Sequence, residues 1–404
     1  MSNTTPTSSA TLSGPALGLL WFGAAVSLAE IMTGTLLAPL GFADGVKAIL
    51  LGHVIGGVLF WLAGYIGAKT GKSAMETVKR SFGQRGSMLF SLANVVQLVG
   101  WTAIMVFSGA AAANFLVPQV GNAGWSLVIG ALIALWIALD LKNMSRLQSV
   151  TAVLLFLLTI LLSVVVFQAE AAQLPAAAQQ TMSFGMAVEL AVAMPLSWLP
   201  LVSDYTRSAR HAGRDTTWAT LAYFIGSSWM FIIGLGAALF AGTGDVAAIM
   251  AKAGLGVAAI LVVVFSTVTT TFLDAASAGI SAASINPKLP ERAAGIAAVV
   301  LGTALALWAP VNSFESFLFL IGSVFAPMIA IMVADYFVLK QDASAQLVSW
   351  PNLALWLAGF GLYRYSMSWD LPVGNTLPVM LIVASVACLC GWLGRKRAAR
   401  AVTA

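Results

Sequence analysis

Ala29-Glu30-Ile31-Met32-Thr33-Gly34 places a carboxylate beside small and polar residues inside the first long apolar stretch of the chain. A charge at the centre of a bilayer costs roughly 3 kcal/mol on insertion scales, so such residues occur where they line a polar cavity within the protein. Met194-Pro195-Leu196-Ser197-Trp198-Leu199-Pro200 brings two prolines into another apolar stretch, and a Thr-rich run ends at Asp274 in a third. Together the three stretches predict a buried polar site in a membrane protein, a pattern typical of transport.

The composition supports a membrane location. Hydrophobic residues make up 60% of the chain and charged residues only 9%, whereas about a quarter of a soluble domain is charged. A membrane-spanning helix needs about 20 apolar residues. Twelve suitable stretches occur, at residues 16–41, 47–68, 87–116, 123–141, 148–168, 183–203, 217–241, 254–284, 293–310, 314–339, 351–368 and 373–394. No loop between them has room for a soluble domain, so residues 1–404 are predicted to form a single transmembrane domain.

Spans one and six are both interrupted, the first after Ala29 and the sixth by Pro195 and Pro200. Interrupted helices at corresponding places are the signature of an inverted repeat with its site at the midplane. We therefore expect an all-α membrane protein of twelve transmembrane helices with discontinuous helices 1 and 6. The predicted repeats cover residues 16–168 and 183–339, and two peripheral helices cover 351–394.

The basic residues indicate the orientation of these spans. With both termini on the cytoplasmic side, only Lys47, Lys252 and Arg364 of the 20 basic residues fall near the outer face. Cytoplasmic loops of membrane proteins carry an excess of Lys and Arg. The chain is therefore expected to be a multi-pass protein of the cytoplasmic (inner) membrane. Its net charge of +5 reports this topology rather than a nucleic-acid partner.

Two polar stripes are candidates for a binding site. Asn94, Gln97 and Trp101 share one face of the third span, since they are three and four residues apart. A flat ligand would fit between the indole of Trp101 and that of Trp198, whose backbone is expected to be unwound between two prolines. For Asn94 and Gln97 the alternative is a hydrogen bond to a neighbouring helix.

Ser266, Thr269 and Thr270 form the second stripe, on the eighth span, with Asp274 one turn further on. Hydroxyl oxygens at one helical level can join the free carbonyls of a broken helix to bind a hard cation such as sodium. Alternatively, these hydroxyls bond back to their own helix. Among the ionisable groups within the spans, Glu30 and Asp274 are the strongest candidates for function. A structural role is expected for His53, and for Glu189 structure and function stay equally open.

Several motifs, in order along the chain, resemble the nucleobase:cation symporter-1 family, the purine, cytosine, allantoin and hydantoin permeases. They are Gly67-Ala-Lys-Thr-Gly71 with Phe82-Gly83-Gln84-Arg85-Gly86, Asp204-Tyr205-Thr206-Arg207, Phe325-Ala326-Pro327 with Asp335-Tyr336-Phe337, and Trp350-Pro351-Asn352. The resemblance implies a LeuT-like inverted five-plus-five helix bundle, cation-coupled uptake, and a heteroaromatic substrate held between aromatic side chains of spans three and six. Hydantoin-type permeases carry a glutamine one turn after the tryptophan of span three, where this chain has Met105. Hydantoin and allantoin are therefore disfavoured.

Thr269-Thr270-Thr271-Phe272-Leu273-Asp274 resembles a subgroup associated with hydroxymethylpyrimidine, a precursor of thiamine. An aminopyrimidine presents an amine beside a ring nitrogen, and Glu30 and Asp274 can supply a carboxyl group that pairs with both. The leading hypothesis is a carrier that imports this pyrimidine with sodium as coupling ion and with no other cofactor. Cytosine or purine permease, or proton coupling, are the alternatives.

Other classes of protein are disfavoured. An enzyme would need a nucleophile with a base or a metal cluster, but His53 and His211 are the only histidines. Phosphate-binding motifs that would indicate coupling to ATP are absent from the sequence. A channel or a receptor stays open, and saturable uptake driven by an imposed ion gradient would separate a carrier from both.

The distribution of basic residues makes the topology testable. A cysteine introduced at Asp245 should react with a membrane-impermeant reagent in intact cells, because this loop is predicted to be external. A cysteine at Ala404 should not react, because the C-terminus is predicted to be cytoplasmic. Labelling at Ala404 in intact cells would overturn the twelve-span arrangement.

Overall fold

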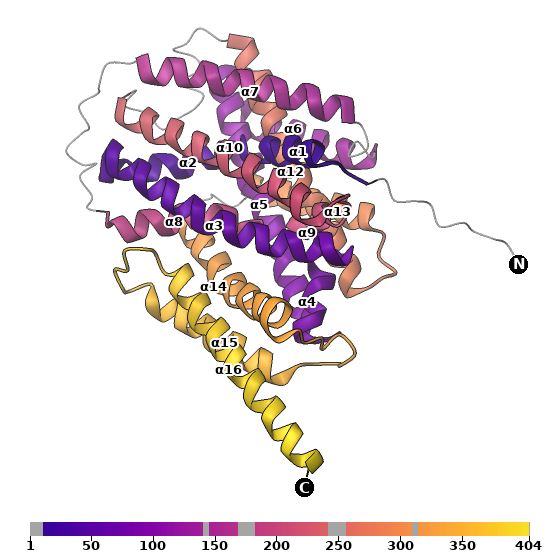
Figure 1. Cartoon of the computed structure of the whole chain (residues 1–404). Coiled ribbons are helices and arrows are strands. Elements are labelled where there is room, and N and C mark those ends of the chain that lie inside the picture. Colours follow the sequence, from indigo (N-terminus) through magenta and orange to yellow (C-terminus); the bar gives the residue numbers. More distant parts are fainter. Residues whose placement is uncertain (1–10, 140–144, 169–181, 241–255, 309–313, 404) are drawn as a thin grey trace, which may run out of the picture.

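The computed structural model describes residues 11–139, 145–168, 182–240, 256–308 and 314–403, and it is helical throughout apart from turns and one isolated bridge (Figure 1). The elements are α1 (Gly14–Ala25), α2 (Leu28–Leu36), η1 (Ala38–Leu40), α3 (Phe42–Thr70), α4 (Ala74–Phe82), α5 (Gly86–Leu116), η2 (Pro118–Val120), α6 (Gly121–Ala138), α7 (Ser145–Gln168), α8 (Phe184–Ser197), α9 (Val202–Thr206), α10 (Ala212–Phe240), α12 (Gly256–Ile285), α13 (Glu291–Trp308), α14 (Phe314–Val333), the π-helix η5 (Ala334–Leu339), α15 (Trp350–Ser366) and α16 (Thr376–Thr403). The predicted all-α class is confirmed.

Eight helical segments of the described chain are long and apolar enough to cross a membrane, and the bent pair α1–α2 makes a ninth. The eight are α3, α5, η2 with α6, α10, α12, α13, α14 with η5, and α16. The remaining predicted spans coincide with α7, with α8 and α9, and with α15. The protein is thus a multi-pass membrane protein, while the count of twelve spans and the repeat symmetry stay predictions.

The first span is broken, as expected, but at Val26 and Ser27 rather than after Ala29. The axes of α1 and α2 differ by 55° across this break. Ser27 has an extended backbone, and its hydroxyl accepts a hydrogen bond from the Glu30 amide (3.3 Å), which caps the start of α2. A serine cap satisfies a free N–H at a helix start, so the predicted interruption from Ala29 to Gly34 is helix instead.

The sixth span breaks as predicted. Pro195 lies inside α8, and the chain leaves the helix at Trp198 and re-enters one at Val202, with Pro200 in the turn between them. By contrast, the Thr-rich run of the eighth span is continuous helix within α12. Its polar residues therefore mark the site without a break in the backbone.

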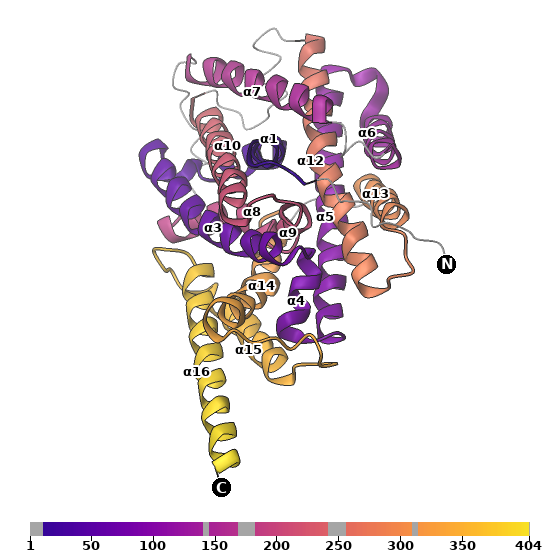
Figure 2. The same cartoon turned by 45° about the vertical axis from the view of Figure 1, so that its right-hand side comes forward.

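The helices pack as a bundle in which α5 and α12 run side by side (Figure 2), α1 packs on α10, and α3 packs on α8. The last two helices, α15 and α16, pack on α14 and on each other, and they lie at the opposite end of the bundle from α7 in both views. Their position at the edge agrees with the predicted peripheral role.

Loops assigned to the same side of the membrane meet in the structure. The N-terminal Leu12 exchanges backbone hydrogen bonds with Ser208 and Arg210 (2.7 and 3.2 Å). The turn after α4 bonds to the segment before α15, with the amide of Arg85 donating to the carbonyl of Leu347 (2.7 Å). All these segments are predicted to be cytoplasmic. The orientation itself stays a prediction, and Asp245 and Ala404 lie outside the described residues.

Two glycines set the distance between α2 and α10. A Cβ at Gly34 would overlap the carbonyl oxygen of Phe231, and a Cβ at Gly234 would overlap that of Ile31. Small residues let membrane helices approach closely. This contact brings the first turn of α2, including Glu30, against the face of α10 that carries Tyr223 and Ser227.

Substitution of Gly234 by alanine should therefore destabilise the fold. The added methyl group has no space, and overpacking typically costs about 1–3 kcal/mol. Thermal unfolding of the purified protein in detergent should show a lower midpoint for Gly234→Ala. Gly23→Ala is the matched control, because nothing lies within 4 Å of a Cβ at that position on α1. Equal midpoints for the two variants would contradict a close contact between α2 and α10.

Candidate functional site

A small central cavity lies where the two broken spans meet α5 and α12. Its volume is about 10 Å³, room for about one water molecule. The lining residues come from all four predicted regions and are Ser27, Ala29, Trp101, Met105, Met194, Ser197, Trp198, Thr270 and Asp274. Three of the six predicted substrate-binding residues, Trp101, Trp198 and Asp274, therefore share one cavity. Side chains must move before a ring-shaped ligand can fit.

Asp274 is the charged group of this cavity. Its side chain is 4% exposed, and within the described part of the chain it forms no hydrogen bond or ion pair. A buried polar group without a partner carries a desolvation cost that a ligand can remove. Asp274 is therefore suited to bind a donor or a cation that enters the cavity.

Two indoles provide flat walls. Trp101 makes edge-to-face contacts with Phe317 and Phe314 (ring centroids 5.4 and 5.9 Å apart), and Trp198 makes one with Trp21 (5.3 Å). The ring N–H groups of Trp101 and Trp198 are both buried and have no hydrogen-bond partner among the described residues. The cavity thus combines the surfaces of two indoles with the Asp274 carboxyl group.

Asn94 and Gln97 connect helices instead of lining the cavity. The Asn94 amide donates to the carbonyl of Pro200 (3.0 Å) and to the Ser281 hydroxyl (2.8 Å). The Gln97 amide donates to Asn94 Oδ1 (2.7 Å) and to the carbonyl of Ser197 (3.3 Å). These bonds hold the unwound turn after α8 against α5, so in this conformation the interhelical alternative describes Asn94. Gln97 keeps one buried oxygen, Oε1, without a partner.

Glu30 also points away from the cavity. Its carboxyl oxygens contact the Tyr223 hydroxyl (2.7 Å) and the Ser227 hydroxyl (2.8 Å), both on α10. In this conformation, therefore, of the two carboxyl groups predicted to pair with an aminopyrimidine, only that of Asp274 lies at the cavity. The reason is the earlier break: α2 starts at Leu28 and packs on α10, which directs the side chain of its first turn to that helix.

The three hydroxyls predicted to bind sodium have different partners. Ser266 donates across the break to the carbonyl of Val26 (2.7 Å), and Thr269 bonds back to the carbonyls of Phe265 and Ser266 on its own helix. The Thr270 hydroxyl is buried, lines the cavity and has no partner among the described residues. Of the three hydroxyl oxygens, that of Thr270 is available to a cation without rearrangement. A second candidate oxygen is the Val26 carbonyl at the break, to which Ser266 donates. Both are hard ligands of the kind that sodium prefers.

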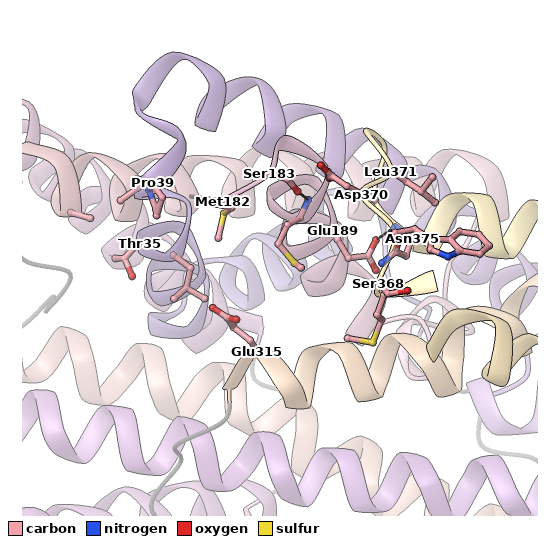
Figure 3. Close-up of a pocket in the computed structure, with 18 residues that line it drawn as sticks. Thr35, Pro39, Met182, Ser183, Glu189, Glu315, Ser368, Asp370, Leu371 and Asn375 are labelled. Carbon is pink, nitrogen blue, oxygen red and sulfur yellow. Dashed lines mark hydrogen bonds between the residues drawn. The ribbon is translucent and has the colours of Figure 1, made fainter. Parts of the chain in front are cut away.

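A second, larger cavity of about 790 Å³ opens at helix ends that the topology places on the outer side (Figure 3). Glu315, Asp370 and Glu189 line it, and none of its lining residues in the described ranges is a Lys or Arg. Glu189 accepts hydrogen bonds from the Tyr363 hydroxyl, from the Thr376 hydroxyl (2.6 Å) and from the backbone amides of Asn375 and Thr376 (2.6 and 2.9 Å). These bonds fasten α8 to the start of α16, which gives Glu189 a structural role.

A family of permeases matches this sequence nearly from end to end. The sequence profile of permeases for cytosine/purines, uracil, thiamine and allantoin matches residues 8–392. The chain belongs to this family. It is a membrane transporter and not an enzyme.

Individual relatives agree with the family. The cytosine permease of Escherichia coli (strain K12) is 28% identical to the permease described here over 328 residues, which cover 79% of this chain and 75% of that protein. Mhp1, a nucleobase-cation-symport-1 family transporter solved in a closed conformation with bromovinylhydantoin bound, superposes with a TM-score of 0.80 at 18% identity, over 96% of both chains. A Na⁺-coupled sialic acid symporter in an outward-open state gives 0.68 at 14% identity, over 94% of this chain and 88% of that one. The two structures show the fold, which is that of LeuT-like transporters as expected.

Sequence reasoning missed several residues of the permease site. Ser27, Met105 and Met194 complete the cavity wall, and Tyr223 and Ser227 bind Glu30. The serine before the Glu30 segment was a recognisable helix-cap signal. Tyr223 and Ser227 gave no such signal, because their partner is nearly 200 positions away in the sequence.

Proposed function

We propose that this permease carries a small pyrimidine with an exocyclic amine, coupled to sodium. The observation that carries the proposal is the partnerless Asp274 carboxyl group in a cavity walled by Trp101 and Trp198. Membership of the permease family and the relationship to a cytosine permease support the substrate class.

The chemistry of an aminopyrimidine matches the cavity. When Asp274 is protonated, its O–H can donate to the ring nitrogen while its carbonyl oxygen accepts from the amine, which gives two parallel hydrogen bonds. The indoles supply flat apolar surfaces for the ring faces. Because the cavity is now too small for a ring, binding requires that Trp101 or Trp198 and the neighbouring methionines separate, consistent with a carrier that alternates between open and closed states.

Cytosine is the first candidate substrate, and hydroxymethylpyrimidine, with the same pair of amine and ring nitrogen, is the second. A purine is the third candidate. Competition for uptake separates them: the true substrate should displace labelled cytosine at the lowest concentration. Failure of all three to compete or to be taken up would contradict the proposed substrate class.

Sodium coupling is proposed from the hydroxyl cluster near the break. On α12, the Thr270 hydroxyl has no partner among the described residues. The carbonyl of Val26, at the break of the first span, accepts a hydrogen bond from Ser266 on α12. Sodium bound there would hold the break of the first span in one geometry and so favour the conformation of the cavity that binds substrate. Linkage requires that substrate then tighten sodium binding by the same factor.

Asp274→Ala should weaken binding of cytosine more than binding of pyrimidin-2-one, because cytosine loses two hydrogen bonds and the analogue, which lacks the amine, loses only the one to its ring nitrogen. Leaving a buried polar group without its hydrogen-bond partner typically costs about 1–3 kcal/mol. Calorimetric titration or thermal-shift measurement with both ligands gives the comparison, and the analogue without the amine is the internal control. Equal losses for the two ligands would assign Asp274 to structure or ion coupling.

Thr270→Ala should weaken the sodium dependence of cytosine binding, with little change in the unfolding midpoint. Thr271→Ala is the matched control, because the neighbouring hydroxyl is equally buried and without a partner but does not line the cavity. Binding is measured at increasing sodium concentration at constant ionic strength. A sodium dependence equal in both variants would remove Thr270 from the ion site, and sodium-independent binding in the unmutated protein would contradict sodium coupling.

A further inference from the structure

A chain of hydrogen-bonding groups lies between α2, α3 and α10, outside the residues that line the central cavity. The Tyr223 hydroxyl lies 2.7 Å from Glu30 Oε1, and Glu30 Oε2 lies 2.8 Å from Ser227 Oγ. The same Ser227 oxygen lies 2.6 Å from Nε2 of His53, whose Nδ1 lies 2.9 Å from the carbonyl oxygen of Ile49. The carboxyl group and the imidazole are thus joined through one hydroxyl group.

This chain is sealed from solvent. Glu30, His53 and Tyr223 are each 1% exposed, and Ser227 is fully buried. The imidazole packs edge-on against Phe231 (centroids 4.8 Å apart) and more loosely against Phe224. Within the described part of the chain, no Lys or Arg forms an ion pair with Glu30. Any charge on Glu30 or His53 must therefore be neutralised within this set of hydrogen-bonded groups.

Counting donors shows that one extra proton is needed. The Ile49 carbonyl can only accept, so Nδ1 of His53 carries a hydrogen, and Nε2 of a neutral imidazole must then accept. If Glu30 is ionised, its Oε2 and the His53 Nε2 both need the single hydrogen of Ser227. One acceptor is then left without a donor, and a buried negative charge is left uncompensated. One added proton between Glu30 and His53 resolves both deficits.

If the proton is on Glu30, both Glu30 and His53 are neutral, and every hydrogen bond of the series has one donor and one acceptor. Tyr223 donates to Glu30 Oε1, the protonated Oε2 donates to Ser227, Ser227 donates to His53, and His53 donates to Ile49. The alternative, a carboxylate and an imidazolium separated by the hydroxyl, buries two charges without direct contact, and the desolvation cost disfavours it.

Other titratable groups of the surrounding helices have partners or positions elsewhere. Tyr223 on α10 is the one that contacts Glu30. The helix α5 carries no ionisable side chain. On α8, Glu189 is bound to Tyr363 and Thr376. On α9, Asp204 accepts from the amide of Ala74 and Tyr205 donates to the carbonyl of Leu273. On α12, Asp274 lines the cavity. On α3, Asp44 pairs with Lys47 at the exposed helix start, and Tyr65 and Lys69 lie near the other end.

These hydrogen-bonded groups contact the wall of the central cavity at two places. The Glu30 amide donates to Ser27, and Ser27 and Ala29 line the cavity. The Tyr223 ring lies edge-on to Trp198, with centroids 6.3 Å apart. A movement of Trp198 or of the break that admits substrate therefore displaces groups bonded to Glu30.

We propose that Glu30, Ser227 and His53 form a binding site for one exchangeable proton, which is taken up and released during the transport cycle. The O–H bond of Glu30 forms with a proton from water on one side of the membrane and breaks to release it on the other. The existence of the site is independent of the proposed function, while its use in transport rests on that function.

The site itself can be tested without a ligand by infrared spectroscopy of the purified protein in lipid vesicles. The spectrum of the unmutated protein minus that of Glu30→Gln should contain the C=O stretch of a protonated carboxyl group at neutral pH, and raising the pH should remove it. Glu30→Gln suits this purpose because its amide can make the same two hydrogen bonds without an exchangeable acid proton. Ser228→Ala, which removes a buried hydroxyl without a partner on the same helix, should match the unmutated spectrum. Absence of the band at every pH where the protein stays folded would overturn the site.

Transport of labelled cytosine into liposomes tests the use of the proton, with equal sodium on both sides. An inward gradient of about one pH unit supports up to about tenfold accumulation when one proton moves with each substrate. The unmutated protein and Ser228→Ala should accumulate cytosine, and Glu30→Gln should lose about tenfold in accumulation, with exchange of labelled for unlabelled cytosine reduced far less. Accumulation by Glu30→Gln at the unmutated level would overturn proton transfer. Absence of all cytosine transport by the unmutated protein would instead contradict the proposed substrate, and the infrared result would then decide the proton site.

Discussion

The structure depends on how the chain satisfies its backbone where the first span breaks. A bilayer offers no water to free N–H and C=O groups, so an open turn at this depth needs partners from the protein. Ser27 caps the start of α2, and the Ser266 hydroxyl donates to the carbonyl of Val26 from α12. The break thus joins α1, α2 and α12 at one point, and the cavity, the hydroxyl cluster and Glu30 are all arranged around it.

Three buried carboxyl groups illustrate three ways to place an acid in a membrane. Glu189 accepts four hydrogen bonds and fastens the peripheral helices to α8. Glu30 is joined to His53 through Ser227, an arrangement that is complete with one added proton. Asp274 has no partner among the described residues and faces the cavity. The number of donors around each group distinguishes the structural Glu189 from the proposed proton site at Glu30 and the proposed ligand site at Asp274, although the three residues look alike in sequence.

The cavity and the proposed proton site are neighbours and not one site. Trp198 lines the cavity and touches Tyr223, which bonds Glu30, so the same movement affects both. A transporter needs a coupling of this kind, because a ligand can shift a conformational equilibrium only through contacts that differ between its states. The amides of Asn94 and Gln97, which hold the turn after α8, add to the stability of the closed arrangement.

The sequence by itself determined the membrane class, the fact that the first and sixth spans are broken, and the three cavity residues Trp101, Trp198 and Asp274, but not the place of the first break. Apolar length, proline and an isolated acid within a span are local properties, and their consequences hold wherever the helix packs. Only the tertiary structure decided that Glu30 turns to α10, that Asn94 connects helices and that Thr269 bonds to its own backbone. A helical stripe shows which side chains share a face, but not which neighbour that face meets. For Glu30 that neighbour is fixed by the close approach of α2 and α10, where Gly34 faces the Phe231 carbonyl and Gly234 faces the Ile31 carbonyl. Close approach of two backbones is a property of a pair of helices that neither segment contains alone.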